Sequence, residues 1–357
     1  MRRFAFFVLI VACLCSCKRA SQTQETTQRS SDNIFKYAKN IYCHPGSDTV
    51  YVYCTWNDSK DTLVYCLRDI KSNSIAVIST TDIAMLAELG ATDQITGICD
   101  PFRTTNPKVQ ERLKQGLVQN VGTSMETNIE ALVALNPDLV ITSAYNSLDL
   151  KKYQHVSCPI VFTTSWQENT PLARIEWIKF VGMLIGKTHE ADSVFAEIEK
   201  KYLALKSRAD SIDTKPLVLA GAASNDIWYM PGGKSYVAQF IADAGGKFIW
   251  EDDENTGSVV LNFEQVLHAS QNADCWIGCD EKSYAELDAM NKNYKLLDVY
   301  KKKAIYNRSK RSFPNGGNDY WEYGYVRPDI VLADYMKIIH PELLPDYETV
   351  FLEKLAE

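Results

Sequence analysis

Residues 127–142 have the sequence Thr-Asn-Ile-Glu-Ala-Leu-Val-Ala-Leu-Asn-Pro-Asp-Leu-Val-Ile-Thr. The first part, from Thr127 to Leu135, predicts a helix that begins with an Asn-x-Glu motif. After a short Asn-Pro connection, Asp138 leads into an apolar run that predicts a buried strand ending at Thr142. A helix that passes almost directly into a buried strand is typical of a parallel sheet covered by helices.

The same pattern occurs a second time, 134 positions further along the chain. Residues 261–277 have the sequence Leu-Asn-Phe-Glu-Gln-Val-Leu-His-Ala-Ser-Gln-Asn-Ala-Asp-Cys-Trp-Ile, again with Asn-x-Glu at a helix start and Asp just before a strand. The matched pair Glu130 and Glu264 therefore indicates two related lobes. Capping alone also explains either glutamate, because the positive end of a helix stabilises a carboxylate in the first turn.

The length of the chain agrees with two lobes. A chain of 357 residues is longer than one hydrophobic core usually supports, so about two domains are expected. Between the two repeats, apolar residues recur at helical spacing over 171–185 and again over 188–208. At 1.5 Å per residue the second helix is roughly 30 Å long, which is enough to hold two lobes apart.

Strands alternate with helices on both sides of this long helix. The alternation predicts an α/β fold of two doubly wound, Rossmann-like lobes joined by a single long inter-lobe helix. Ahead of the first lobe, strand-like runs at 50–55 and 62–67 flank a turn-rich stretch and predict a β-hairpin. In the second lobe, residues 228–233 are predicted to form a loop.

The first residues carry the pattern of an exported protein. Two arginines precede an uninterrupted apolar run from Phe4 to Cys15, which is too short to remain as a spanning helix. The run ends in Leu-Cys-Ser-Cys at 14–17, which resembles the lipobox of bacterial lipoproteins, so we expect cleavage after Ser16 and a lipid on Cys17. A plain signal peptide without lipid is the alternative. Cleavage removes the two arginines and takes the net charge from −7 to −9.

These patterns divide the chain into six predicted parts. They are a signal peptide at 1–16, a lipid-anchored flexible tether at 17–33, an N-terminal hairpin extension at 34–73, an N-terminal lobe at 74–170, a helical segment at 171–211 and a C-terminal lobe at 212–357. The tether is polar and rich in Gln, Ser and Thr, as flexible linkers are.

Charge and motifs argue against several classes of protein. The acidic balance argues against a nucleic-acid partner. The sequence has no HExxH, GxSxG, P-loop or GxGxxG motif, and its five histidines are scattered. We therefore expect no catalytic residues, no metal ligands and no cofactor. Seven cysteines follow Cys17, mostly in apolar strand-like runs, which favours buried free thiols although an exported compartment permits disulfides.

The helix–strand stretch also carries a family resemblance. The sequence resembles the substrate-binding proteins of ABC importers for ferric siderophores, haem and cobalamin, in a lipoprotein branch of that family. The residues that carry the resemblance are 122–141, 188–208, 228–236 and 316–322. The resemblance implies a class III periplasmic-binding-protein fold. It extends from about Ser74 to Leu344, and the hairpin region before it has no functional account.

In this family an acidic residue on each lobe docks onto arginines of the membrane permease. By position those residues are Glu130 and Glu264 here. The chemistry is plausible, because exposed carboxylates pair with guanidinium groups in bidentate geometry and steer docking. The implied partners are an ABC permease and ATPase complex, a small-molecule ligand, and a membrane reached through the lipid of Cys17. The implied location is the cell envelope, facing the periplasm.

The family binds its ligand in the cleft between the lobes. In open α/β sheets such clefts lie at the carboxyl ends of the strands, so polar and aromatic residues that follow the strands are the candidates. Aromatic rings suit flat chelates and arginines suit anionic ones. The candidates are Thr80, Phe102, Arg103, Tyr145, Trp166, Trp228, Tyr229, Arg308, Arg311, Asn318 and Trp321. For each, core packing or a solvated surface position is the alternative.

The sequence thus predicts a lipid-anchored substrate-binding protein of an ABC importer, with no enzymatic activity. A ferric siderophore-type chelate is the first expectation for its ligand, because arginines and aromatics occur together. Cobalamin and haem are the alternatives within the same class. A lipoprotein that only scaffolds a partner, or a periplasmic hydrolase, are alternatives from other classes.

Overall fold

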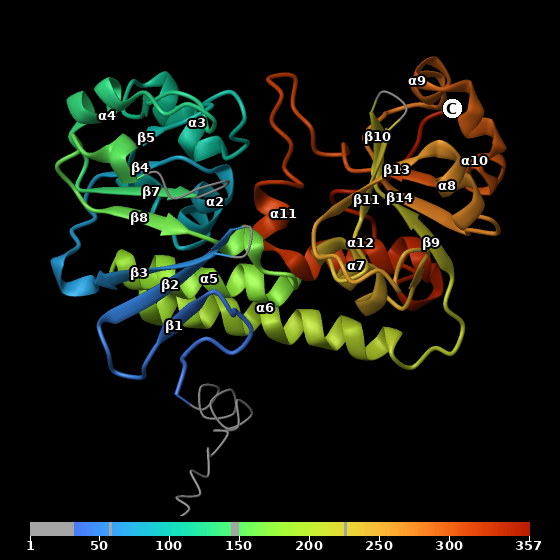
Figure 1. Cartoon of the computed structure of the whole chain (residues 1–357), viewed down its shortest axis with the longest axis horizontal. Helices are drawn as coiled ribbons and strands as arrows, with labels where there is room; N and C mark the ends of the chain where they lie inside the picture. The colour runs from blue at the N-terminus through green and yellow to red at the C-terminus, as the bar shows by residue number, and fades with distance from the viewer. Residues whose placement is uncertain (1–31, 57–58, 144–149, 225–226) are drawn as a thin grey trace, which may run out of the picture.

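The computed structural model describes residues 32–56, 59–143, 150–224 and 227–357. Two α/β lobes lie side by side, and helix α6 (Thr188–Ala209) runs below both of them in the view of Figure 1. Cys17, the predicted signal peptide and Tyr145 lie outside the described residues. Among the described helices, none is both long enough and apolar enough to cross a membrane.

The first lobe is built on a five-stranded parallel sheet with the order β6-β5-β4-β7-β8. Its strands are β4 (Ile75–Val77), β5 (Ile95–Ile98), β6 (Gln119–Asn120), β7 (Leu139–Ser143) and β8 (Ile160–Thr163). Its helices are α2 (Thr80–Glu88), α3 (Pro107–Lys114) and α4 (Ile129–Leu135). The central strands are apolar and buried on both faces, as parallel strands between helices must be.

The second lobe has a five-stranded sheet with the order β12-β9-β14-β15-β16, in which β15 and β16 form the antiparallel pair. Its strands are β9 (Leu217–Ala220), β12 (Lys247–Phe248), β14 (Cys275–Cys279), β15 (Ile305–Asn307) and β16 (Glu353–Lys354). Its helices are α7 (Tyr236–Asp243), α8 (Phe263–Ala269), α9 (Tyr284–Met290), α10 (Asp298–Lys301) and α12 (Pro328–Ile339). The predicted fold class is confirmed in both lobes.

A second, antiparallel sheet accompanies this lobe and was not expected from the sequence. It has the order β10-β11-β13, with β10 (Ala222–Ser224), β11 (Ile227–Pro231) and β13 (Ser258–Asn262). The prediction of a loop at 228–233 is therefore wrong over most of its length. The Pro-Gly-Gly sequence suggested a loop, but pairing between Pro231 and Ser258 continues the strand to the proline.

The predicted internal repeat is confirmed by equivalent contacts in the two lobes. The carboxylate of Asp138 accepts a hydrogen bond from the backbone N–H of Ser74 at 3.1 Å, and that of Asp274 accepts one from Leu217 at 2.9 Å. Asp138 precedes β7 and Asp274 precedes β14. Each aspartate therefore ties its own strand to the residue that leads into, or begins, the neighbouring parallel strand.

The inter-lobe helix α6 joins the lobes through two other helices. It contacts α5 (Pro171–Leu184) on the side of the first lobe and α12 on the side of the second. Its 22 residues span about 33 Å. A Cβ atom at Gly182 would lie only 2.4 Å from the Cβ of Ala191, so glycine is needed where α5 and α6 approach each other.

The N-terminal extension forms a small antiparallel sheet with the order β1-β2-β3. Its strands are β1 (Ile41–Cys43), β2 (Thr49–Trp56) and β3 (Ser59–Cys66). The hydroxyl of Tyr65 accepts a hydrogen bond from the backbone N–H of Phe162 at 2.9 Å. Since β8 is an edge strand, the extension satisfies part of an otherwise unpaired edge of the first lobe.

Two buried carboxylates hold the residues just before this hairpin. Glu176 on α5 accepts hydrogen bonds from the backbone N–H groups of Lys36, Tyr37 and Ala38 at 2.7, 2.7 and 2.8 Å. Glu168 accepts bonds from the next two N–H groups, those of Lys39 and Asn40, at 3.0 and 2.8 Å. These hydrogen bonds to successive backbone N–H groups fix residues 36–40 onto the first lobe.

One part of the C-terminal half packs against the first lobe. Residues 309–327, called here the crossing segment, include α11 (Tyr323–Val326), which contacts α2. The buried carboxylate of Glu322 accepts a hydrogen bond from the Thr104 hydroxyl at 2.8 Å and one from the Thr105 backbone N–H at 2.6 Å. The sequence range predicted for the C-terminal lobe therefore includes a segment that is packed on both lobes.

The seven cysteines of the described residues are all free thiols, and five of them are buried. Burial raises the pKa of Cys99 to about 11 and that of Cys275 to about 12. Such thiols remain protonated near neutral pH and are poor nucleophiles. The expectation of buried single cysteines is thus confirmed for most of them.

Candidate ligand site between the lobes

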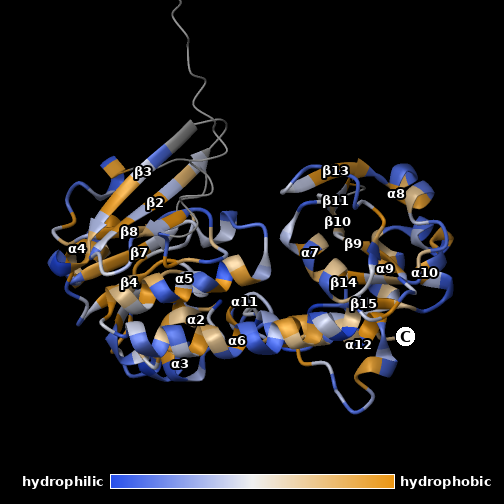
Figure 2. Ribbon diagram, turned by 90° about the horizontal axis from the view of Figure 1, so that it is seen from below, coloured by the Kyte–Doolittle hydropathy of each residue, from blue (hydrophilic) through white to orange (hydrophobic). Residues whose placement is uncertain are grey.

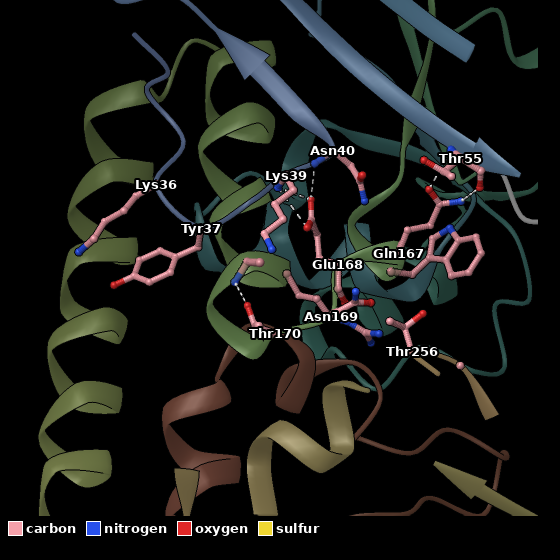
Figure 3. A pocket seen from close by; sticks show the side chains of 14 residues that line it. Lys36, Tyr37, Lys39, Asn40, Thr55, Gln167, Glu168, Asn169, Thr170 and Thr256 are labelled. Carbon is pink, nitrogen blue, oxygen red and sulfur yellow. Dashed lines mark hydrogen bonds between the residues drawn. The ribbon is translucent and has the colours of Figure 1, made fainter. Parts of the chain in front are cut away.

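A cavity of about 730 Å³ lies where the extension, the first lobe and the second lobe meet. In Figure 2, β2 and β3 stand on the same side of the molecule as β13. Thr55 of β2 lines the cavity, and so do Thr256 and Gly257, which precede β13. Its lining residues are Lys36, Tyr37, Lys39, Asn40, Thr55, Trp166, Gln167, Glu168, Asn169, Thr170, Ala173, Arg174, Thr256 and Gly257 (Figure 3). The volume is that of a site for a drug-sized ligand.

The loop between β8 and α5 forms the floor of the cavity. Thr170 caps α5, since its hydroxyl accepts a hydrogen bond from the backbone N–H of Ala173 at 3.3 Å, and Pro171 opens the helix. Gln167 makes two hydrogen bonds with the backbone of Thr55 on β2, at 3.0 and 3.3 Å (Figure 3). These contacts join the floor to the extension.

Glu168 has a structural part in the wall. Its side chain is buried, and besides the two backbone N–H groups it accepts a bond from the indole N–H of Trp177 at 3.3 Å. Burial raises the pKa of Glu168, while the donors from Asn40, Lys39 and Trp177 oppose the shift. Its oxygens are thus directed at fixed donors of the protein.

Cationic side chains line the cavity from two elements. Lys36 is paired with Glu199 at 2.6 Å. Lys39 has no ion pair with any described residue. Arg174 donates from Nε to the backbone oxygen of Glu168 at 2.8 Å and stacks over the ring of Tyr236 at 3.9 Å, and none of the described carboxylates forms an ion pair with it. The cavity therefore has two cations with no carboxylate partner among the described residues.

Of the predicted ligand residues that the structure describes, Trp166 is the one that lines this cavity, where its side chain is partly buried. Trp228 has a different place, and here the prediction is corrected. Its indole is 1% exposed, donates its N–H to the backbone oxygen of Ala220 at 3.0 Å and packs against Trp276 with ring centroids 4.7 Å apart. It is a core residue. Its neighbour Tyr229 is 46% exposed, because successive residues of β11 point to opposite faces of the sheet.

Most of the other predicted residues gather around the crossing segment. Phe102 and Arg103 lie exposed on the loop after β5, and a Cβ atom at Gly316 would lie 3.8 Å from the Phe102 ring. The Arg308 guanidinium is paired with Asp280 at 2.5 Å and stacks over Trp321 at 4.8 Å. The fold thus places the loop that carries Phe102 and Arg103 beside the crossing segment at Gly316.

Two further members of the set have internal partners. Asn318 donates to the backbone oxygen of Arg308 at 3.1 Å and accepts from the N–H of Tyr320 at 3.0 Å, so its amide shapes the segment. Arg311 is paired with Asp319 at 2.5 Å. Arg311 lines a smaller cavity of about 310 Å³ between the crossing segment and α2. Thr80, the first residue of α2, is partly exposed.

The two predicted docking glutamates are exposed on equivalent helices. Glu130 follows the N-cap Asn128 of α4, and Glu264 follows the N-cap Asn262 of α8. In Figure 1, α4 lies above the sheet of the first lobe and α8 lies on the outer flank of the second lobe.

Sequence reasoning missed most of the cavity. The extension residues Lys36, Lys39 and Asn40 precede the predicted strands, and Arg174 lies on a helix rather than after a strand. Of the predicted ligand residues that the structure describes, only Trp166 indicated this cavity. Among the described residues, no cluster of three or more His, Cys, Asp or Glu side chains is arranged to hold a bare metal ion.

Comparisons with known proteins agree with this architecture. A family model described as periplasmic binding protein matches residues 75–304. An uncharacterized lipoprotein of Methanocaldococcus jannaschii is 25% identical over 94% of this chain and 93% of its own length. A protein of Halobacterium salinarum described as a cobalamin-binding protein is 24% identical over 58% of this chain and 53% of its own length.

Solved structures are similar at the level of the fold. The periplasmic haem-binding protein of Pseudomonas aeruginosa has a TM-score of 0.60 at 14% identity, covering 80% of this chain and 98% of that one. The periplasmic vitamin B12-binding protein of Vibrio cholerae has a TM-score of 0.54 at 13% identity, covering 75% of this chain and 96% of that one.

Proposed function

This chain belongs to the periplasmic binding protein family, and we propose that it captures a ferric siderophore-type chelate between its lobes for an ABC importer. The observation that carries the proposal is the inter-lobe cavity with its tryptophan and with two cations that form no ion pair with a described residue. A ferric chelate with acidic groups matches Lys39 and Arg174 in charge, and Trp166 offers a flat apolar surface.

The delivery step is proposed from the two exposed glutamates. Glu130 and Glu264 would meet arginines of the permease, one on each lobe. Their support is their matched position in the first turn of α4 and of α8. The helix α6, packed on both lobes, favours a small closing movement over a large hinge rotation, so the separation of the two glutamates would be nearly constant.

The membrane anchor is proposed from the N-terminal sequence and from relatives. Residues 14–17 resemble a lipobox, and two relatives of Methanocaldococcus jannaschii are described as lipoproteins. Lipid on Cys17 would keep the protein at the membrane in which the permease lies. A single chain would bind the membrane only marginally, so stable anchoring needs more than one acyl chain.

Cobalamin is the second candidate ligand, favoured by the relative of Halobacterium salinarum that is described as a cobalamin-binding protein. Haem is the third, supported by the fold neighbour from Pseudomonas aeruginosa.

The test is a binding panel with the purified mature chain. The probes are a ferric tris-catecholate, a ferric tris-hydroxamate, haem and cyanocobalamin, each titrated by tryptophan fluorescence and calorimetry. We expect saturable one-to-one binding of a ferric chelate. Tight binding of cyanocobalamin or haem alone would select that alternative, and silence toward all four probes would reject the proposed function.

A further inference from the structure

The extension contributes one complete wall of the inter-lobe cavity. Lys36, Tyr37, Lys39, Asn40 and Thr55 line it, and all of them precede the residues matched by the family model, which begin at residue 75. The second lobe contributes Thr256 and Gly257 from across the cavity. This wall is therefore an addition to the two lobes that the family shares.

The wall is rigid at the point where it meets the cavity. The backbone N–H groups of residues 36–40 are all bonded to the carboxylates of Glu176 and Glu168. A backbone held at five successive residues cannot rearrange without leaving buried carboxylates unpaired, which is costly. The backbone positions from which its side chains project into the cavity are thus set before any ligand arrives.

Two cations from different elements face this cavity. Figure 3 shows the Lys39 side chain extending past Glu168 toward the loop that carries Thr170. Arg174 lies one helical turn beyond that loop, with its Nε fixed on the backbone oxygen of Glu168 at 2.8 Å. The terminal nitrogens of Arg174 donate no hydrogen bond to another described residue. Both groups can therefore donate to a ligand without first losing a partner.

Lys36 shows the contrast within the same segment. Its ammonium is already bonded to Glu199 at 2.6 Å, and the Tyr37 hydroxyl bonds to the same carboxylate. Of the lysines on this wall, Lys39 is the one whose charge is not compensated by an ion pair with a described residue. Lys39 is exposed and Arg174 is partly buried. A partly buried guanidinium that has no counter-charge among the described residues favours an anion in the same cavity, and Lys39 adds a second positive charge there.

We propose that the N-terminal extension is a specificity wall of the ligand site, and that Lys39 and Arg174 form an anion subsite for acidic oxygen atoms of the ligand. This inference rests on the proposed function, because it places the ligand in the same cavity. It predicts that the protein selects ligands by negative charge as well as by shape. The acidic group would lie between the extension and the start of α5.

The experiment compares charge variants on probes of different charge. K39Q, R174Q and R174K are titrated with the ferric tris-catecholate and haem, which are anionic, and with the ferric tris-hydroxamate, which carries no negative charge. K71Q is the matched control, since Lys71 is an exposed lysine of the extension outside the cavity. Thermal unfolding of each variant checks that the fold is retained.

We expect K39Q and R174Q to bind the anionic probe with an affinity about tenfold or more below that of the wild type, as the loss of a charge-assisted hydrogen bond predicts. R174K should recover part of the affinity, and K71Q should bind as the wild type. Affinity of the wild type for the anionic probe should fall with salt, and that of K39Q should fall less steeply.

Two results would overturn the inference. If the wild type binds an anionic probe and K39Q and R174Q bind it equally well, the subsite is wrong while the proposed function stands. If the wild type binds only the tris-hydroxamate, the charge selection is wrong and the importer function again stands. Silence of the wild type toward every probe would remove the proposed function and the inference together.

Discussion

The carboxylate of Glu176 accepts a hydrogen bond from the backbone N–H of Ala38 at 2.8 Å, across 138 positions of sequence. The side chain of Glu176 is fully buried on α5, and it also accepts the N–H groups of Lys36 and Tyr37. One carboxylate thus carries three backbone bonds of a segment that precedes the first lobe. It makes the extension a part of the folded body.

Replacing Glu176 by alanine should therefore destabilise the protein and release the extension. Three backbone donors would lose their partner, and we expect a loss of about 3 kcal/mol in the free energy of unfolding. Urea unfolding measures this loss, and hydrogen exchange at residues 36–40 should rise before global unfolding. The exposed Glu190 on α6 provides the control, since its alanine variant should unfold as the wild type does. Equal stability of the two variants would contradict the assigned role.

Asp82 predicts a pH dependence of stability. It is fully buried on α2, and its bonds are to the Thr163 hydroxyl at 3.2 and 3.3 Å. Burial raises its pKa to about 7, from a usual value of 3.8 that the unfolded chain keeps. Between these two values the folded state holds a proton that the unfolded state releases. The contribution of Asp82 to stability is therefore complete below pH 4 and is lost as the pH rises to about 7.

The variant D82N isolates this effect because asparagine cannot ionise. We expect it to melt close to the wild type at pH 4 and at a higher temperature at pH 8, by about 2 °C or more. The comparison is made as a difference between the two proteins at each pH, so other titrating groups cancel. A difference in melting temperature that does not change with pH would show that Asp82 does not titrate in this range.

The paired glutamates make a prediction about transport. Alanine at both Glu130 and Glu264 should abolish uptake through the importer while ligand affinity stays unchanged, because both side chains are exposed and neither lines the cavity. Each single variant should lower uptake by about tenfold or less, since one lobe can still dock. Uptake in cells and affinity of the purified protein are measured in parallel. The control is a double alanine variant at Glu126 and Glu254, which are also exposed, and it should transport normally. If the variant at Glu130 and Glu264 takes up ligand as the wild type does, the docking role is wrong.

The lipobox makes a prediction about location. C17S should leave the protein unlipidated and shift it from the membrane to the soluble envelope fraction. Replacing the other nearby cysteine, Cys15 in the signal, with serine (C15S) should not affect lipidation. Mass spectrometry of the mature N-terminus and phase separation in detergent measure both. A wild-type chain that begins at Cys17 without lipid would instead support a plain signal peptide.

The sequence predicted the fold well where local pattern and burial agree. The helix of residues 188–208, the repeat around Glu130 and Glu264 and the buried parallel strands all have periodic apolar residues and clear boundaries. It failed at β11, where Pro231 and two glycines suggested a loop. β10 pairs only with Ile227 to Tyr229, so Pro231 lies beyond that ladder and its missing N–H costs no bond there.

The site was harder to predict for a related reason. The rule that ligand residues follow strands led to Trp166, which lines the cavity, and equally to Trp228, which packs against Trp276. Both are tryptophans near strands, and their sequence neighbours do not show which one lines a cavity and which one packs in the core. For Trp228 the answer depends on which face of β11 the second lobe covers.

By itself, the sequence determined the two-lobed α/β architecture and the long inter-lobe helix, because these follow from periodicity and from contacts close in sequence. The family was indicated by the resemblance of particular stretches to known proteins. Only the tertiary structure decided where the inter-lobe cavity lies and that the extension is one of its walls. Glu176 and Ala38 are 138 positions apart, and nothing local to either residue reveals that a buried carboxylate on α5 will find its donors there. The cavity exists because three segments distant in sequence are brought together by such long-range bonds.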